Sequence, residues 1–277
     1  MISIENLHFS YSKSPVFKGI STHLEAGHVY GILGKNGTGK STLLHLISGL
    51  LFPSNGKLTV MGYTPGQRKP SFLADIFMVP EEFHLPNISI VDFIDLNAPF
   101  YPKFNRNQFF GYIEGFGIPE STLQAMSYGQ KKKVLISFGL ATNVSVLLMD
   151  EPGNGLDIVS KSQLRKMIAG AVDGNKCLLI SSHQVKDLEN LIDDVLIIDD
   201  TRIILKQSLQ KIASKLSFRI SFDPEDLHHA LYSEPLLRGN TLVTPNIEGE
   251  ESNIDLEILY KAAMADPEKL QAVMSEL

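Results

Sequence analysis

The sequence predicts an α/β protein whose core is a mostly parallel β-sheet covered by helices on both faces. Three short runs support this prediction, at residues 146–149, 177–180 and 195–198. Each run is apolar at every position, which is typical of strands buried on both faces. Helical patterns around 157–170 and 184–192 separate the runs, and buried strands that alternate with helices indicate parallel pairing.

The first third of the chain is expected to form strands and one helix. Residues 1–33 show near alternation of apolar residues and then a short apolar run that ends at a glycine, so we expect strands there. A helix is expected over about 40–49, because its apolar residues share one face and Pro53 follows its end. Residues 76–80 predict another strand.

Between about 84 and 143 the apolar period becomes helical. Ser89 and Asn105 are suitable N-cap residues, and Gln108, three residues after Asn105, would complete a capping box. From about 211 the pattern becomes less regular, and the chain ends in an acidic, helix-like segment.

Composition predicts a folded chain with an appendage. Of the 277 residues, 43% are hydrophobic, which is enough for a core and excludes global disorder. The net charge is −6, and the segment from Asn246 onward, with eight acidic residues and two lysines, accounts for all of it. We therefore expect one unit over residues 1–210 and a small acidic extension over 211–277. The charge argues against a nucleic-acid partner.

The single cysteine, Cys177, excludes a disulfide framework and a cysteine metal cluster, and we expect it to lie in the core. The N-terminus has no signal-peptide pattern. No apolar run approaches the roughly 20 residues that a membrane helix needs. These features predict a soluble protein in a reducing compartment.

Residues 34–41 read GKNGTGKS and match the phosphate-loop pattern between an apolar strand and a helix. Glycines let backbone N–H groups turn toward phosphate oxygens, and the helix N-terminus adds its dipole. Lys40 would place its charge at the β- and γ-phosphates, and Ser41 would offer a hydroxyl to Mg²⁺. A chance match is expected in about one in a hundred chains of this length. The predicted nucleotide contacts are Gly34, Asn36, Gly37, Thr38, Gly39, Lys40, Ser41 and Thr42.

Asp150 and Glu151 follow the buried strand at 146–149, at the edge where ligands bind in open α/β sheets. Asp150 is suited to hold Mg²⁺ directly or through water. Glu151 is suited to polarise an attacking water. Two acids after a strand can also simply begin a solvated loop, but the phosphate loop upstream strongly favours the catalytic interpretation.

Five motifs in register resemble those of ATP-binding subunits of ABC transporters. The first is the phosphate loop together with Asp150. The second is Met126–Gln130, MSYGQ, which resembles the LSGGQ signature and whose serine, Ser127, stands 23 residues before Asp150. Residues 153–157, GNGLD, resemble the D-loop of this family. His183, 33 residues after Asp150, resembles the switch histidine. Tyr11 stands where the family stacks an aromatic ring on adenine.

The resemblance covers residues 1 to about 210. It implies a P-loop NTPase (RecA-like) core with an N-terminal antiparallel β-subdomain, an inserted helical subdomain at about 84–143 and a small C-terminal extension. It implies hydrolysis of ATP with Mg²⁺, in which Glu151 and His183 are the catalytic residues. Such subunits pair head to tail on binding ATP. The signature residues that would then face the nucleotide of the opposite chain are Ser127, Gly129 and Gln130.

The resemblance also implies a separate integral membrane permease, docked on the helical subdomain. The chain would then be cytoplasmic and peripheral at the inner face of the cell membrane. The ATPase pair would be a homodimer or would include a second ATPase subunit. The pattern is closest to exporter-type subunits, whereas the substrate depends on the permease and is not indicated.

Two residues depart from the family pattern. Glu81 stands where the family has a glutamine after the strand at 76–80, and its carboxylate can still approach Mg²⁺ or its water. We therefore count Glu81 with Ser41 and Asp150 as a predicted metal ligand. Tyr128 replaces the first glycine of the signature, so its ring is expected to point away from the nucleotide.

Other interpretations stay open at this point. An ABC-type ATPase that acts on DNA or ribosomes is disfavoured, because the chain has one phosphate loop, no heptads and no basic segment. A degenerate subunit is disfavoured because Lys40, Asp150, Glu151 and His183 are all present. Tyr11 is alternatively an ordinary strand aromatic. The three lysines at 131–133 predict a solvated helix face, without chemistry.

Overall fold

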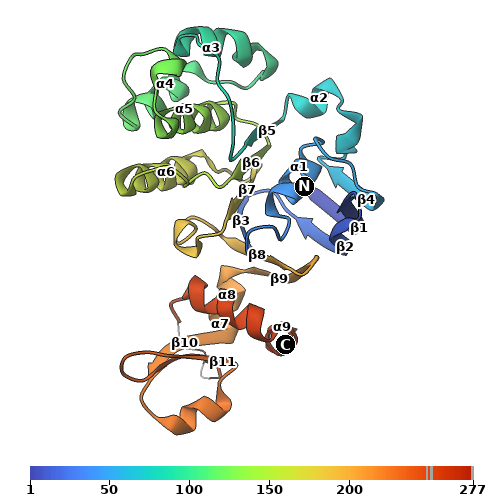
Figure 1. Ribbon diagram of the computed structural model, residues 1–277, viewed down its shortest axis with the longest axis vertical. Coiled ribbons are helices and arrows are strands. Elements are labelled where there is room, and N and C mark those ends of the chain that lie inside the picture. The colour runs from blue at the N-terminus through green and yellow to red at the C-terminus, as the bar shows by residue number, and fades with distance from the viewer. Residues whose placement is uncertain (248, 250–251, 276–277) are drawn as a thin grey trace.

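The computed structural model describes residues 1–247, 249 and 252–275. Four acidic residues counted in the tail, Glu248, Glu250, Glu251 and Glu276, lie outside the described residues. Figure 1 shows a central sheet with an N-terminal β-unit beside it, a helical lobe at one end and a C-terminal unit at the other. The central sheet therefore lies between the other three parts.

The central sheet has six strands in the order β5-β6-β7-β3-β8-β9. They are β3 (His28–Leu33), β5 (Ile76–Val79), β6 (Val146–Asp150), β7 (Cys177–Ser182), β8 (Asp194–Asp199) and β9 (Arg202–Ser208). Every neighbouring pair is parallel except β8 with β9. The prediction of a mostly parallel sheet is confirmed.

Burial on both faces explains why these strands are apolar at every position. Leu147 and Met149 enter one hydrophobic core, which continues into the helical lobe and the C-terminal unit. Val146 and Leu148 enter a second core, shared with the N-terminal β-unit. Successive side chains of a strand point to opposite faces, so each layer takes alternate residues. Cys177 is fully buried in the second core, as expected.

The N-terminal β-unit is an antiparallel sheet in the order β2-β1-β4. Its strands are β1 (Ile2–Tyr11), β2 (Ser14–Leu24) and β4 (Asn55–Val60). The helix predicted over 40–49 is α1 (Lys40–Ile47), and Gly49 follows it at a φ of 74°, a left-handed conformation typical of a helix end. A short helix, α2 (Pro70–Leu73), precedes β5.

The helical lobe consists of α3 (Ile90–Asn97), α4 (Arg106–Gly115) and α5 (Tyr128–Ala141). Ser89 caps α3 in a complete capping box, and the Asn105 side chain accepts the backbone N–H of Gln108 at the start of α4. The predicted return contact from Gln108 is wrong. Its amide nitrogen instead donates to the Tyr112 hydroxyl at 2.8 Å, one turn along the helix.

Phe138 lies at the centre of the lobe's aromatic core and is 1% exposed. Its ring centroid is 5.0 to 6.4 Å from those of five other aromatic residues, Phe77, Phe93, Tyr101, Phe104 and Phe109. The replacement Phe138→Ala should lower the free energy of unfolding by about 3–5 kcal/mol, because it leaves a cavity that the neighbouring rings cannot fill.

Urea unfolding followed by circular dichroism measures this loss. The matched control is Phe100→Ala in the same lobe, where the side chain is 70% exposed and the expected change is within about 0.5 kcal/mol. Equal losses in the two variants would contradict the central place of Phe138.

The helix predicted over 157–170 is α6 (Ile158–Ala171), which links β6 to β7. The helix predicted over 184–192 is wrong, because only the 3₁₀ turn Val185–Asp187 forms there. Asn190 has a φ of 58°, which an α-helix does not accommodate. The Ile192 side chain packs over Gly31 of β3, where an added Cβ would come within 2.6 Å of its Cδ1.

The C-terminal unit contains a second antiparallel sheet, in the order β10-β12-β11. Its elements are α7 (Leu209–Lys215), β10 (Leu216–Ser221), β11 (Tyr232–Pro235), β12 (Asn240–Pro245), α8 (Leu256–Ala265) and α9 (Pro267–Ser275). The expected loss of regular structure is therefore wrong for 216–245, whereas the helical end is confirmed. The remaining 3₁₀ turns are Pro65–Gln67, Ala98–Phe100, Leu123–Ala125 and Pro224–His229.

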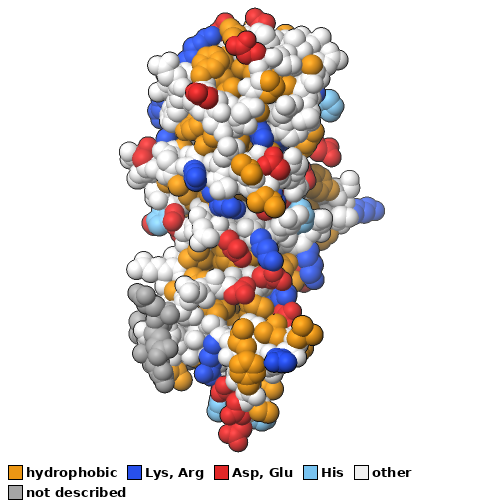
Figure 2. Space-filling view, turned by 90° about the vertical axis from the view of Figure 1, so that its left-hand side faces the viewer, with side chains coloured by type: hydrophobic (Ala, Val, Ile, Leu, Met, Phe, Trp, Pro, Cys, Tyr) orange, Lys and Arg blue, Asp and Glu red, His pale blue; other side chains and the backbone are white. Residues whose placement is uncertain are grey.

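On the face seen in Figure 2, hydrophobic side chains are dispersed among charged ones over the helical lobe and gather on the C-terminal unit at the bottom. The exposed apolar side chains of that unit include Ile220, Phe222, Leu236 and Leu237. Among the helices of the described ranges, none combines the length and the apolar character that crossing a membrane requires.

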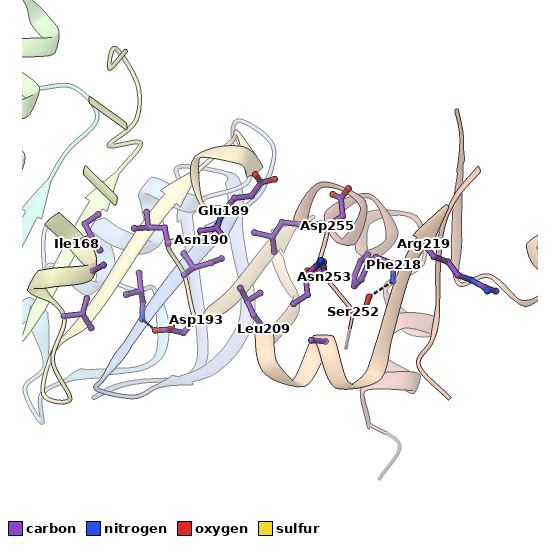
Figure 3. Close-up of a pocket in the computed structure, with 18 of the residues that line it drawn as sticks. Ile168, Glu189, Asn190, Asp193, Leu209, Phe218, Arg219, Ser252, Asn253 and Asp255 are labelled. Carbon is purple, nitrogen blue, oxygen red and sulfur yellow. Dashed lines mark hydrogen bonds between the residues drawn. The ribbon is translucent and has the colours of Figure 1, made fainter. Parts of the chain in front are cut away.

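A cavity of about 1250 Å³ lies between the central sheet and the C-terminal unit (Figure 3). Asp193 accepts the backbone N–H of Val29 at 3.0 Å, and Ser252 accepts that of Phe218 at 2.9 Å. The side chains of Asp193 and Ser252 are therefore engaged in hydrogen bonds to the backbone around the cavity. The phosphate loop contributes nothing to the lining, so this cavity is separate from the nucleotide site.

Candidate active site

The phosphate loop, residues 34–39, turns sharply between β3 and α1. Gly37 and Gly39 have φ values of 83° and 106°, which L side chains rarely adopt. A Cβ on Gly39 would also come within 2.6 Å of the Val16 side chain. Both glycines are therefore required by the backbone, and the turn directs the N-terminus of α1 toward the space where phosphates would bind.

Lys40 folds back under this loop and is 6% exposed. Its Nζ donates to the carbonyl oxygens of Gly34 at 2.9 Å and Lys35 at 3.2 Å, and it lies 3.9 Å from Oε1 of Glu151. Burial lowers the pKa of Lys40, and the nearby carboxylates, Glu151 foremost, oppose that shift. The ammonium thus joins the phosphate loop to the acid at the end of β6.

Glu151 lies between Lys40 and His183 and is 5% exposed. Its Oε2 is 2.9 Å from Nδ1 of His183, and its Oε1 faces Lys40. Burial raises the pKa of Glu151, while His183 and then Lys40 act in the opposite direction. Its φ of 45° is unusual for a side chain of this size, and such backbone strain is typical of functional sites. This arrangement suits a general base that His183 orients.

Asp150 is 3% exposed at the end of β6 and lies opposite Ser181 of β7. The Ser181 hydroxyl donates to Oδ1 of Asp150 and accepts the backbone N–H of Glu151 at 3.0 Å. Ser181 therefore fixes both acids, a role that we did not predict. The signal was present, because Ser181 belongs to the same short run as His183.

The oxygen donors of this site fit Mg²⁺. Ser41 lies in the first turn of α1, and its hydroxyl and the buried carboxylate of Asp150 are the kind of hard ligands that Mg²⁺ binds together with phosphate oxygens. The Glu81 carboxylate accepts a hydrogen bond from Asn154 Nδ2 at 3.0 Å. Its place as a third ligand stays a prediction, as do the assignments of Ser41 and Asp150.

Tyr11 lies at the end of β1, beside the start of α1. Its hydroxyl is 3.4 Å from Oγ1 of Thr42, and its ring contacts Phe9 edge-on at 4.9 Å between centroids. The side chain remains 49% exposed. A half-exposed ring beside the phosphate loop is suited to stack on adenine, and this role stays a prediction.

The signature forms the start of α5 in the helical lobe. The Ser127 hydroxyl accepts the backbone N–H of Gln130 at 3.3 Å, and the Gln130 side chain accepts that of Ser127 at 2.9 Å, which completes a capping box. A Cβ on Gly129 would come within 2.7 Å of the Gly155 carbonyl oxygen, so only glycine permits this approach to the D-loop. Within the described residues, no hydrogen bond or ion pair joins Ser127–Gln130 to the phosphate loop.

Tyr128, the unusual residue of the signature, contacts the loop after β5 in its own chain. Its ring stacks on Phe83 at 5.2 Å between centroids, and its hydroxyl donates to the Glu81 carbonyl oxygen. The two departures from the family pattern, Tyr128 and Glu81, therefore touch one another. How the ring lies relative to the nucleotide of an opposite chain stays a prediction.

The prediction of a solvated lysine face at 131–133 is wrong for Lys132, which is fully buried. Its Nζ donates to the carbonyl oxygens of Pro80 at 3.1 Å, Glu81 at 3.2 Å and Asp150 at 3.4 Å. Burial lowers the pKa of Lys132, and the charges of Glu81, Asp150 and Glu151 raise it. The sequence conceals this role, because three consecutive lysines give no sign of which one faces inward.

The phosphate loop and the two acids at the end of β6 define the class of protein. A glycine loop between a strand and a helix, with paired acids at the end of another strand of the same parallel sheet, is the site of a P-loop NTPase. Residues 17–154 match the family model described as "ABC transporter". The chain belongs to this family as an ATP-binding subunit, and its enzymatic activity is that of an ATPase. ATPase subunits of the family dimerise and work with membrane components.

Several characterised proteins are similar to this chain. The "Linearmycin resistance ATP-binding protein LnrL" of Bacillus subtilis (strain 168) is 29% identical over 78% of this chain and 72% of its own length. The "Nod factor export ATP-binding protein I" of Ralstonia nicotianae (strain ATCC BAA-1114 / GMI1000) is 25% identical over 99% of this chain and 84% of its own. A solved structure titled "Structure of ATP binding subunit of ABC transporter" has a TM-score of 0.69 and is 22% identical; the match covers 76% of this chain and 91% of that chain. That structure confirms the fold.

Proposed function

We propose that this chain drives transport through a separate integral membrane permease, by closing as a head-to-tail pair around two ATP molecules. The observation that supports the pair is the separation of two half-sites. The phosphate loop and the signature Ser127–Gln130 share no hydrogen bond or ion pair within the described residues, and Ser127 is exposed. A second copy would supply the signature to each phosphate loop.

The residues of the phosphate-loop side have distinct tasks in hydrolysis. Lys40 and the loop N–H groups would bind the phosphates, and Ser41 and Asp150 would hold Mg²⁺, which neutralises phosphate charge. Glu151, held by His183 at 2.9 Å, would orient the attacking water and take its proton. Loss of the γ-phosphate would then remove the link between the two chains.

Mixing two inactive variants tests the shared site. Lys40→Met removes the phosphate contact and Ser127→Arg blocks the signature, so each homodimer lacks activity. A mixed dimer with two-fold pairing contains one intact site, built from the loop of the Ser127→Arg chain and the signature of the Lys40→Met chain. An equal mixture should therefore recover about a quarter of the native ATPase rate. No recovery would mean that each site is complete within one chain.

The helical lobe offers a surface for the proposed permease. Val91, Leu96 and Phe100, at and beside α3, are 44%, 63% and 70% exposed. Phe100 is the most exposed of the three, and aromatic residues are enriched at protein interfaces. This surface lies on the lobe that carries the signature, so docking there would link the signature to a membrane partner.

The replacement Phe100→Asp should reduce co-sedimentation of the chain with membranes of its native host by about tenfold or more, because it puts a charge in the proposed apolar contact. Its ATPase rate in solution should stay within about twofold. The control is Phe222→Asp, which changes a similarly exposed phenylalanine of the C-terminal unit. Membrane binding that Phe100→Asp leaves intact would exclude this surface.

A further inference from the structure

Lys132 is a buried lysine whose hydrogen bonds go to backbone carbonyl groups. Within the described residues it forms no ion pair, and its side chain is 0% exposed. A buried ammonium is costly unless its donors are satisfied. Here three backbone carbonyl oxygens accept its three N–H groups, at 3.1, 3.2 and 3.4 Å. Lysine is the residue whose flexible stem and three donors suit this arrangement.

The three carbonyl groups belong to the two segments that surround the reacting end of the nucleotide site. Pro80 and Glu81 form the loop after β5, and Asp150 ends β6, next to Glu151. Lys132 itself lies in the second turn of α5, the helix that begins with the signature. One side chain thus connects the signature helix to the loop after β5 and to the catalytic strand.

Aromatic side chains reinforce the same connection. The Phe83 ring has Tyr128 stacked at 5.2 Å, and the Lys132 Nζ lies 5.6 Å from its centroid, within the range of a cation–π contact. The Tyr128 hydroxyl donates to the same Glu81 carbonyl oxygen as Lys132 does. Lys132, Tyr128 and Phe83 therefore form one contact group, which we call the Lys132 joint.

We propose that Lys132 is a positioning residue for ATP hydrolysis, which holds the signature at a set placement relative to the Glu81 loop and the end of β6. The proposal rests on the proposed function, because the signature acts on the nucleotide of the opposite chain. Without the joint, the start of α5 loses its support at the catalytic edge. A displacement of about 1 Å in a group that positions reactants can cost 10²-fold in rate.

If the Lys132 joint positions the signature, replacing Lys132 should lower kcat and leave the KM for ATP almost unchanged. Lys132→Gln keeps two donors and Lys132→Met keeps none, so kcat should fall by about tenfold in the first and by about 10²-fold in the second. The KM for ATP should stay within about threefold, since the phosphate loop is unchanged. The matched control is Lys131→Gln on the same helix, which should leave both values within about twofold.

A second readout is the ATP-induced dimer in a Glu151→Gln background. Adding Lys132→Gln should raise the dimer dissociation constant by about tenfold, as sedimentation measures it, because the signature is no longer held in place. The Lys132→Gln and Lys132→Met chains are first compared with the native chain by circular dichroism and urea unfolding. If Lys132→Met does not fold, Lys132→Gln alone decides the proposal.

A double-mutant cycle tests whether Tyr128 and Lys132 act through one acceptor. The losses in kcat from Tyr128→Phe and Lys132→Gln should be non-additive by about threefold or more. Additive losses, or a native kcat in a folded Lys132→Gln chain, would overturn the proposal. Turnover is measured on the otherwise native chain, so it decides the role of Lys132 even if the Glu151→Gln parent stays monomeric with ATP. That last result would contradict the head-to-tail pair instead.

Discussion

The replacement Glu151→Gln should lower the ATPase rate by about 10²-fold or more while ATP still binds. An amide has nearly the shape of the carboxylate but cannot take a proton from water. It also removes the carboxylate from the contact with His183, whose Nδ1 lies 2.9 Å from Oε2. The phosphate loop and Lys40 are unchanged, so affinity for ATP should stay within a few-fold of the native value.

Steady-state ATPase assays and the binding of a fluorescent ATP analogue separate these two effects. Glu189→Gln, a half-buried acid at the rim of the cavity in Figure 3, is the control and should retain native turnover. If Glu151→Gln turned over ATP at a near-native rate, Glu151 would not be the general base.

The replacement Ser127→Arg should abolish ATPase activity, with a loss of about 10²-fold or more. Ser127 is exposed at the start of α5, and an arginine there would fill the space that the γ-phosphate of the opposite nucleotide needs. Binding of ATP by the isolated chain should persist, because the phosphate loop shares no hydrogen bond with Ser127 in the described residues.

Loss of a helix cap is the competing explanation, and it typically costs about 1 kcal/mol. Ser89→Arg removes an equivalent capping box from α3 in the same lobe and serves as the control. We expect Ser89→Arg to retain ATPase activity within about threefold. Equal loss of activity in both variants would show that capping, and not the signature, explains the result.

Local motifs were predictable because adjacent residues and short spacings determine their chemistry. The glycines around Lys40 require left-handed backbone and a helix start, and those requirements appear directly in the sequence. The central strands were predictable for a similar reason, since burial on both faces makes every position apolar.

Features that depend on packing between distant segments were not predictable. Lys132 is buried because the Glu81 loop and the end of β6 place three carbonyl groups around it, and nothing near 131–133 in the sequence indicates this. The segment 184–192 has helical periodicity, but its Ile192 packs over Gly31 and its Asn190 takes a positive φ. Tertiary contacts decided both outcomes.

The division of the chain near residue 210 remains our proposal. The central sheet ends with β9 at Ser208, and α7 begins at Leu209. The hydrophobic core continues across this point, since Leu205 of β9 and Ile212 of α7 belong to the same cluster. The C-terminal unit is therefore packed on the ATPase core.

The mass of the Glu151→Gln chain in solution tests the central claim, that ATP closes two copies of this chain into a pair. Sedimentation is measured with Mg²⁺ and ATP, with Mg²⁺ and ADP, and without nucleotide. ADP lacks the γ-phosphate that the opposite signature would contact, so only ATP binds the pair better than the single chain. We predict that the mass doubles with ATP alone, and that adding Ser127→Arg prevents this. Equal mass in all three conditions, at concentrations up to tens of micromolar, would contradict the account.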